Sequence, residues 1–86
     1  MTILVDEPRW PAHGTRFAHL VSDASTAELE AFVAQLELPR PLRFHRDHYD
    51  IPERYWHQIV DAGARVVATR EIVLRLRSSG LRAPAR

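Results

Sequence analysis

The 86-residue sequence contains no cysteine, which excludes disulfide bonds, thiolate metal sites and cysteine nucleophiles. It also contains no lysine, so every basic side chain other than histidine is an arginine. No apolar run approaches the roughly 18 residues of a membrane-spanning helix, and the first six residues are too short for the core of a signal peptide. The formal net charge is only +1, which disfavours binding driven mainly by attraction to nucleic acid. We therefore expect a cytoplasmic protein with no membrane partner.

The composition is that of one small folded domain. Hydrophobic residues make up 45% of the chain and charged residues 27%, which is close to the globular average and argues against disorder. A chain of this length supports a single core. We expect one domain over residues 1–80 and a flexible tail over residues 81–86. Four of the five histidines lie between His13 and His48, so imidazole is concentrated in one part of the chain.

Hydrophobic patterning predicts strands that alternate with helices. The predicted strands are Thr2–Val5, Arg16–Val21, Leu42–His45 and Arg65–Ala68, and Arg9–Thr15 is predicted to be a loop. The predicted helices begin at Ser25, at Asp50 to Pro52 and at Thr69, and they end near Glu37, Gly63 and Gly80. This order predicts an α/β domain with about four strands in a mostly parallel sheet and three helices. The link of about 10 residues between the first two strands is short for a parallel crossover, so an antiparallel first pair stays open.

Reactive polar side chains follow the predicted strands. They are Asp23 after the second strand, His45, Asp47, His48 and Asp50 after the third, and Thr69, Arg70 and Glu71 after the fourth. In open α/β sheets, ligands bind beyond the carboxyl ends of the parallel strands. We therefore expect these groups to meet at one edge of the sheet.

Imidazole and carboxylate groups are the ligands that suit zinc, manganese or iron. The predicted ligand set is His13, His19, Asp23, His45 and His48. The cofactor expected from this set is a divalent ion, zinc or manganese. The alternative is structural, with Asp47 or Asp50 capping the second helix and the histidines bonded to the backbone of a turn.

The same segment also allows catalysis without a metal. The predicted catalytic residues are His48, Asp47 and Asp50, with His48 as a general base that a carboxylate orients. The predicted anion-binding residues are Thr69, Arg70 and Arg46, because helix N-termini and guanidinium groups favour phosphate or carboxylate. In the competing interpretation, Thr69 caps the third helix and Arg70 is solvated.

Three other positions have competing interpretations. Trp10 either stacks on a ligand ring or covers the core. His57 falls on the polar face of the second helix and is expected to be solvated. Leu74 falls off the apolar stripe of the third helix, so we expect it to be exposed, either as part of a surface for self-association or as a single surface leucine that needs no special role.

Several blocks of the chain resemble one protein family. They are Val5-Asp6, Trp10, His13-Gly14, His19 to Asp23, Glu28-Leu29, Phe32, Phe44-His45, His48 to Asp50, Gly63-Ala64 and Arg70-Glu71. Over nearly its whole length the chain resembles short bacterial and phage proteins of the DUF4031 type, a domain of unknown function. Members of that family often carry a histidine directly after the Glu-Leu pair of the first helix, where this chain has Glu30. The resemblance implies one compact domain of bacterial or phage type and brings no catalytic assignment.

The predicted site favours a small domain that binds or hydrolyses a phosphate-bearing small molecule or nucleotide with the help of a metal ion. The alternative is a non-catalytic binding or adaptor module that acts as a homo-oligomer or as a partner subunit. Nucleic-acid binding through arginines and aromatic residues is less favoured than either, because acidic residues balance the arginines.

Overall fold

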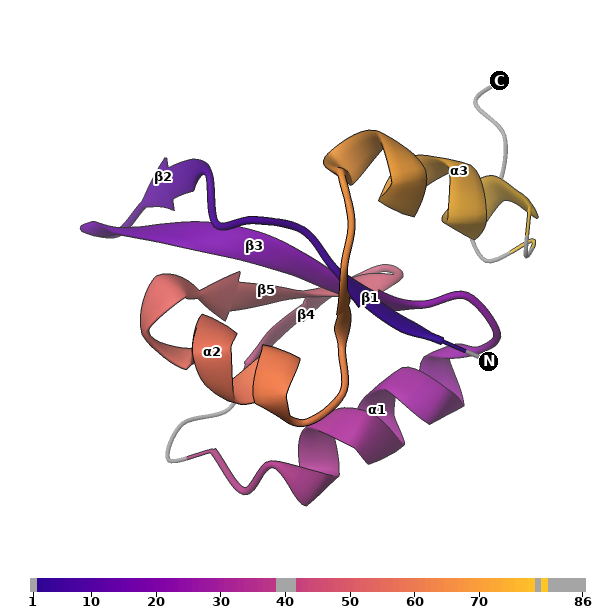
Figure 1. The fold of residues 1–86 in the computed structure, drawn as a ribbon, viewed down its shortest axis with the longest axis horizontal. Coiled ribbons are helices and arrows are strands. Elements are labelled where there is room, and N and C mark those ends of the chain that lie inside the picture. The colour runs from indigo at the N-terminus through magenta and orange to yellow at the C-terminus, as the bar shows by residue number, and fades with distance from the viewer. Residues whose placement is uncertain (1, 39–41, 79, 81–86) are drawn as a thin grey trace.

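The computed structural model describes residues 2–38, 42–78 and 80. Its elements are β1 (Ile3–Val5), β2 (Trp10–Ala12), β3 (Thr15–Ser22), α1 (Thr26–Gln35), β4 (Arg43–His45), β5 (His48–Pro52), α2 (Glu53–Asp61), β6 (Arg65–Val66) and α3 (Thr69–Ser78). Figure 1 shows the sheet crossing the middle of the fold with helices on either side. Within the described ranges, no helix is long and apolar enough to cross a membrane. The predicted tail of residues 81–86 lies outside the described residues.

The predicted α/β class is confirmed, but the prediction of a mostly parallel, four-stranded sheet is wrong. The sheet is mixed and has six strands in the order β4-β5-β3-β1-β6, with β2 paired to β3 beside this path. Among the pairings in the described part of the chain, only that of β1 with β6 is parallel. The antiparallel alternative for the first two predicted strands is confirmed, since Val5 of β1 lies opposite Leu20 of β3 in an antiparallel pair.

A tight turn that was not predicted from the sequence joins β2 to β3. His13 and Gly14 both have positive φ angles, 49° and 78°, as the two central residues of a type I′ hairpin turn do. They connect Ala12 to Thr15, which are cross-strand partners. Part of the predicted loop at Arg9–Thr15 is therefore a strand.

A second hairpin joins β4 to β5. Arg46 has a φ of 59°, and the Asp47 N–H donates to the His45 carbonyl oxygen at 2.7 Å. This turn reverses the chain, so the residues that follow pair with β4 and β3 as strand β5. The second helix consequently begins at Glu53 and not at Asp50 to Pro52. Adjacent strands of a hairpin must be antiparallel, which is why the parallel prediction failed here.

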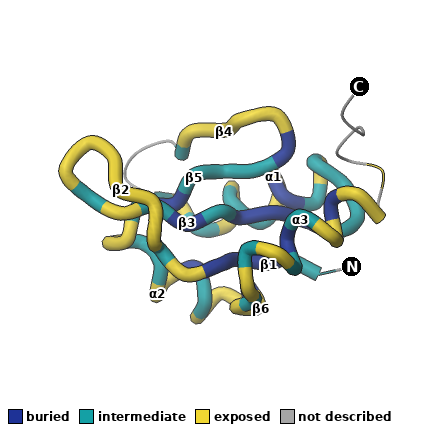
Figure 2. The backbone as a smooth tube through the Cα atoms, turned by 90° about the horizontal axis from the view of Figure 1, so that it is seen from above, coloured by how far each residue is buried: buried dark blue, intermediate teal, exposed yellow. Residues whose placement is uncertain are grey.

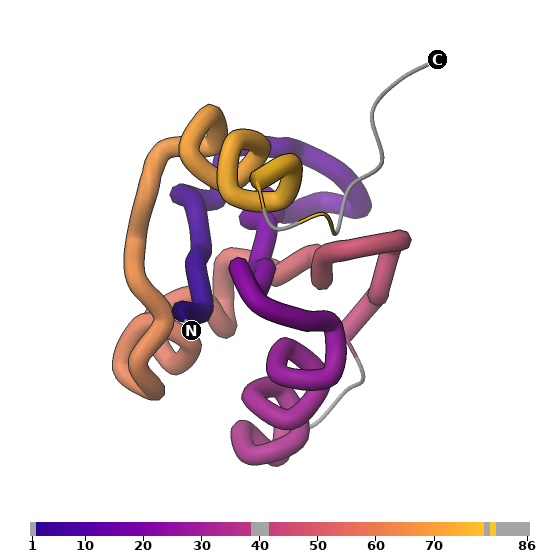
Figure 3. Tube along the Cα trace, turned by 90° about the vertical axis from the view of Figure 1, so that its right-hand side faces the viewer, coloured from indigo at the N-terminus to yellow at the C-terminus, as the bar shows by residue number. Residues whose placement is uncertain are grey.

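Helices cover both faces of the sheet. Helices α1 and α2 lie on one face and α3 lies on the other (Figure 1 and Figure 3). The larger core, on the side of α1 and α2, consists of Val5, Ala18, Leu20, Leu29, Ile51, Ile59 and Ala64. The smaller core, under α3, consists of Leu4, Val21, Ile72 and Leu76. Because successive strand residues point to opposite faces, β1 and β3 each contribute to both cores.

Helix α3 lies toward one end of the sheet, and the exposed β2 hairpin lies toward the other (Figure 2). The helix packs on β1 and on β3. The α3 face therefore has an apolar part beneath the helix and a more open part near β2.

The helix starts follow from local capping, and the ends differ slightly from prediction. The Ser25 side chain accepts from the Glu28 N–H at 3.0 Å, which caps α1 as predicted. Helix α1 ends at Gln35 and α3 at Ser78, each about one turn or less before its predicted end.

Candidate metal centre

Three side chains with metal-binding atoms meet on the α3 face of the sheet. Leu20 of β3 belongs to the larger core, so its neighbour His19 points to the opposite face. On β5, Ile51 faces the larger core, and the same alternation turns His48 and Asp50 toward His19. His19 and Asp50 are direct cross-strand partners. One ligand atom from each of the three side chains lies within 4.8 Å of the other two.

Asp6, the residue after β1, positions His19. Its carboxylate is buried, with 1% relative exposure. Oδ1 accepts from the His19 backbone N–H at 2.6 Å, and Oδ2 lies 2.8 Å from His19 Nδ1. The Asp6 N–H also donates to the His19 carbonyl oxygen at 3.3 Å. Because a carboxylate accepts at Nδ1, a neutral His19 carries its proton there, and Nε2 is the nitrogen through which the ring would bind a metal.

Contacts from two helices hold Asp6 in place. The Thr69 hydroxyl, at the first residue of α3, donates to Asp6 Oδ2 at 2.7 Å. The Trp56 indole N–H, on α2, donates to the Asp6 carbonyl oxygen at 2.8 Å. Helices from opposite faces of the sheet therefore meet at this one residue.

His48 lies between two carboxylates. Its Nδ1 is 2.9 Å from Oδ1 of Asp47, which is buried with 5% relative exposure. Its Nε2 is 3.3 Å from Oδ1 of Asp50. A neutral imidazole with its proton on Nδ1 would turn the Nε2 lone pair toward the Asp50 carboxylate, and the two groups would repel each other. A positive charge between them, either a proton on Nε2 or a cation shared with Asp50, removes this repulsion.

This donor set fits a divalent transition metal. Two imidazoles and one carboxylate are a ligand set of the catalytic type, which leaves a coordination position open. The same combination suits zinc, manganese or ferrous iron. Asp6 and Asp47 stand behind His19 and His48 as the carboxylates that orient metal-binding histidines commonly do.

Aromatic rings surround the cluster. The rings of His19 and His48 lie edge to face with centroids 5.1 Å apart. Trp10 lies edge-on to His19 at 4.5 Å, and His45 to His48 at 5.5 Å. The Trp10 side chain has 39% relative exposure, so it forms an outer wall of the site and does not cover the core.

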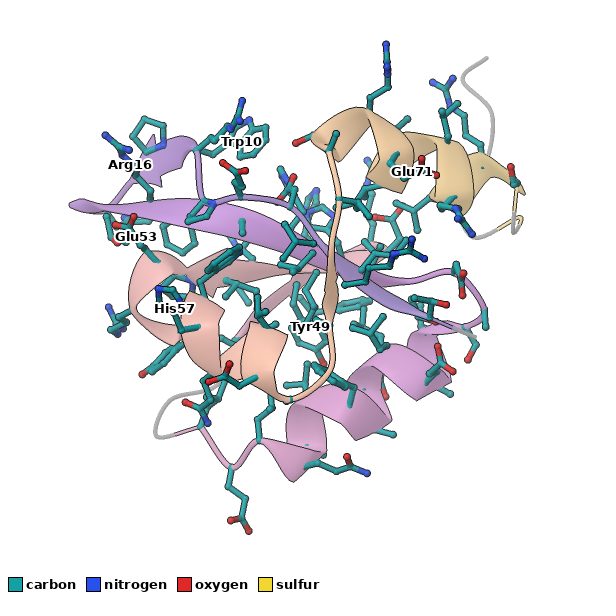
Figure 4. The ribbon with its side chains drawn as sticks, viewed as in Figure 1. Trp10, Arg16, Tyr49, Glu53, His57 and Glu71 are labelled. Atoms are coloured by element: carbon teal, nitrogen blue, oxygen red, sulfur yellow. The ribbon has the colours of Figure 1, made fainter. Side chains whose placement is uncertain are left out.

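Tyr49 marks the opposite face of β5. In Figure 4 its side chain lies on the side of α1 and α2, whereas Trp10 lies on the other side of the sheet. Burial raises the pKa of the Tyr49 hydroxyl above its ordinary value, and the negative charge of Glu30 raises it further. Tyr49 therefore belongs to the core layer and takes no part in the cluster.

A cavity of about 380 Å³ opens beside the cluster. His19 and Asp50 contribute to its lining, so two of the three potential ligands face it. Trp10, Phe17 and Tyr55 supply aromatic walls, and Arg43 and Arg54 supply positive charge.

Of the five predicted metal ligands, the structure brings His19 and His48 together with Asp50. His13 lies in the turn between β2 and β3 and lines the cavity. His45 is exposed on β4, with its ring against that of His48. Asp23 lies beyond the end of β3, where it accepts from the Thr2 N–H at 2.8 Å and faces Arg75 at 3.5 Å.

All three predicted catalytic residues, His48, Asp47 and Asp50, lie at the cluster. The helix-capping alternative does not hold for the two carboxylates, because Asp47 bonds to His48 and the N-cap of α2 is Pro52. The role of Asp6 was missed. Its signal in the sequence is a carboxylate placed directly after a buried apolar strand.

The predicted anion-binding residues do not form one group: Thr69 and Arg70 are neighbours on α3, whereas Arg46 lies in the turn between β4 and β5. The Thr69 hydroxyl bonds to Asp6. Arg46 is exposed in the turn between β4 and β5, and Arg70 is exposed in the first turn of α3. The arginines that line the cavity are instead Arg43 and Arg54.

The predicted exposure of His57 and of Leu74 agrees with the structure. His57 is exposed on α2, where Figure 4 shows it away from the sheet. Leu74 is exposed on α3, with 52% relative exposure.

A family model matches most of the chain. Residues 3–79 match the model of a family described as protein of unknown function (DUF4031). Neither the curated proteins nor the solved structures gave a match.

Proposed function

The chain belongs to the DUF4031 family of proteins of unknown function, and we propose that it is a metal-dependent hydrolase of small phosphate esters. The metal is a divalent ion, zinc or manganese, held by His19, His48 and Asp50. The single observation that carries the proposal is the meeting of these three ligand atoms within 4.8 Å, on histidines that buried carboxylates orient.

The electrostatics of the cluster support a cation. Asp6, Asp47 and Asp50 bring three carboxylates to two imidazoles, and Asp6 and Asp47 are buried. Buried negative charge is costly unless a positive group compensates it. A divalent ion between His48 Nε2 and the Asp50 carboxylate supplies that charge where the two groups face each other at 3.3 Å.

The open side of the cluster supports hydrolysis over a purely structural role. Structural zinc sites are closed by four protein ligands, whereas sites with three protein ligands leave room for water and substrate. A divalent ion in such a site polarises a phosphoryl oxygen and activates water for attack. The cavity reaches His19 and Asp50, so a substrate can approach the ion from that side.

The arginines of the cavity support a phosphate substrate. Guanidinium groups bind phosphate through paired, charge-assisted hydrogen bonds, and Arg43 and Arg54 both line the cavity. In the proposed reaction, a bond forms between the water oxygen and phosphorus, and the ester P–O bond breaks. One water proton passes to the leaving alkoxide, so the products are an alcohol and inorganic phosphate.

Metal titration of tag-free protein tests the first half of the proposal. We expect one Zn²⁺ or Mn²⁺ per chain, and we expect His48→Ala and Asp50→Asn to lose at least 10-fold in affinity, as removal of a ligand should. His57→Ala is the matched control, because His57 is exposed on α2 and its ring contacts Trp56. Substoichiometric binding, or equal affinity in all four proteins, would contradict the metal site.

Release of phosphate from p-nitrophenyl phosphate tests the second half. The metal-loaded protein should release phosphate, and both the EDTA-treated protein and Asp50→Asn should not. A stoichiometric metal without any phosphate release would leave the metal site standing and reject the hydrolase.

A further inference from the structure

The cavity beside the metal centre has two kinds of wall. Trp10, Phe17 and Tyr55 give it three aromatic rings, and Arg43 and Arg54 give it two guanidinium groups. Its volume of about 380 Å³ is near the lower end of the range for small-molecule pockets. A ligand of this cavity is therefore small and has both a flat apolar part and a negative part.

Trp10 is placed to stack on a planar ring. It comes from the edge strand β2, its edge-on contact with His19 at 4.5 Å holds it beside the metal ligands, and 39% of its surface is exposed. Exposed aromatic side chains beside a cavity are the usual platforms for nucleobases, which all offer a flat π face.

Arg54 brings positive charge to the rim of the same cavity. Its guanidinium carbon lies 4.9 Å from the centroid of the Tyr55 ring, a cation–π arrangement that favours one side-chain position. Arg43 is the cross-strand partner of Asp50, so this second guanidinium arises from the backbone position opposite a metal ligand. Arg43, Arg54 and Asp50 all line the same cavity, so a phosphate bound there lies between the positive charges of the two arginines and the proposed metal ion.

From this arrangement we infer that the cavity binds a nucleoside monophosphate, with the base against the aromatic wall and the phosphate between the arginines and the metal centre. The inference rests on the proposed function for the phosphate end of the ligand and on the aromatic walls for the base. It narrows the substrate from any small phosphate ester to a mononucleotide.

Calorimetric titration of the metal-loaded full chain tests the inference. The probes are hydrolysis-resistant phosphonate analogues of AMP, of CMP and of ribose 5-phosphate, together with adenosine. At least one nucleotide analogue should bind at least 10-fold more tightly than the ribose 5-phosphate analogue, which lacks the base, and than adenosine, which lacks the charge. Equal affinity for the phosphonates with and without a base would overturn the inference.

Two pairs of variants connect the binding to the cavity walls. Trp10→Leu should reduce nucleotide affinity at least 5-fold, and Phe44→Leu should not, although Phe44 has a similar exposure of 40%. Arg54→Gln should reduce affinity for the nucleotide phosphonates and for the ribose 5-phosphate analogue alike, whereas Arg77→Gln on α3 should not. Unchanged nucleotide affinity in both Trp10→Leu and Arg54→Gln would overturn the inference even if a nucleotide binds.

Metal titration of the same samples separates this inference from the proposed function. Stoichiometric metal with no preference for a base overturns the nucleotide inference and leaves the metal centre in place. If no metal binds, the proposed function fails. A preference for the base in the metal-free protein would then still support the cavity assignment, and the absence of that preference would overturn it.

Discussion

Asp6 and His19 are joined by three hydrogen bonds. The Asp6 carboxylate accepts from both the backbone N–H and the Nδ1 of His19, and the Asp6 N–H donates to the His19 carbonyl oxygen. The same carboxylate accepts from Thr69 at the start of α3. One buried side chain thus links β1, β3 and α3 and also sets the orientation of a proposed metal ligand. Both the stability of the fold and the orientation of His19 therefore depend on the Asp6 side chain.

Asp6→Asn should destabilise the protein. The substitution keeps the shape but removes the charge and turns an NH₂ group toward a donor, which should lower the free energy of unfolding by about 3 kcal/mol. Urea denaturation measures the change. Asp61→Asn is the control, because Asp61 is exposed at the end of α2 and a surface change is usually within about 0.5 kcal/mol. Equal stability of the two variants would show that the hydrogen bonds of the Asp6 carboxylate do not stabilise the fold.

Asp47→Asn should weaken metal binding without preventing folding. Asp47 bonds to His48 Nδ1 at 2.9 Å, and loss of such an orienting carboxylate typically lowers metal affinity by about 10–100-fold. The measurement is a Zn²⁺ titration against a competing chelator, with circular dichroism to confirm folding. Retention of the full affinity by folded Asp47→Asn would mean that Asp47 does not orient a ligand.

Thr69→Val should lower stability through one lost hydrogen bond. The hydroxyl donates to the buried Asp6 carboxylate at 2.7 Å, and a bond to a charged group contributes about 1.5–3 kcal/mol. Thr69→Ser keeps the hydroxyl and should recover most of that loss in thermal or urea unfolding. If serine fails to recover more than valine does, the hydroxyl is not the reason for the effect.

Leu76→Ala and Leu74→Ala should differ sharply although both lie on α3. Leu76 is fully buried in the smaller core, so its truncation should cost about 3 kcal/mol. Leu74 has 52% relative exposure, and its truncation should change the free energy of unfolding by about 0.5 kcal/mol or less. Similar losses in the two variants would mean that α3 presents a different face to the sheet.

Hydrophobic periodicity predicted the three helices and the α/β class because those signals are local. The Ser25 cap, the exposure of Leu74 and the polar face that carries His57 all follow from spacing within one helix. Strand pairing is not local, and the sheet was predicted less well. Gly14 is a signal that could have suggested the hairpin, because glycine adopts the positive φ that a type I′ turn requires.

The site was predicted in composition but not in arrangement. The density of histidine and aspartate around His48 pointed to this segment, because histidines and carboxylates are the strong candidate ligands in a chain without cysteine. Which side chains lie near His48 depends on the register of β3 and β5. That register places His19 opposite Asp50 and leaves Asp23 beyond the end of β3. Asp6 comes to His19 across 13 positions of sequence through the pairing of β1 with β3, so only the sheet topology reveals the contact.

The most direct test of the metal centre is a crystal structure of the Zn²⁺-soaked protein with anomalous scattering at the zinc edge. We predict one strong anomalous peak about 2.0–2.2 Å from a ring nitrogen of His19, a ring nitrogen of His48 and a carboxylate oxygen of Asp50. Asp6 and Asp47 should remain hydrogen bonded to the two rings. A peak only at an exposed histidine such as His57, or no peak at the cluster under conditions in which zinc binds elsewhere, would contradict the account.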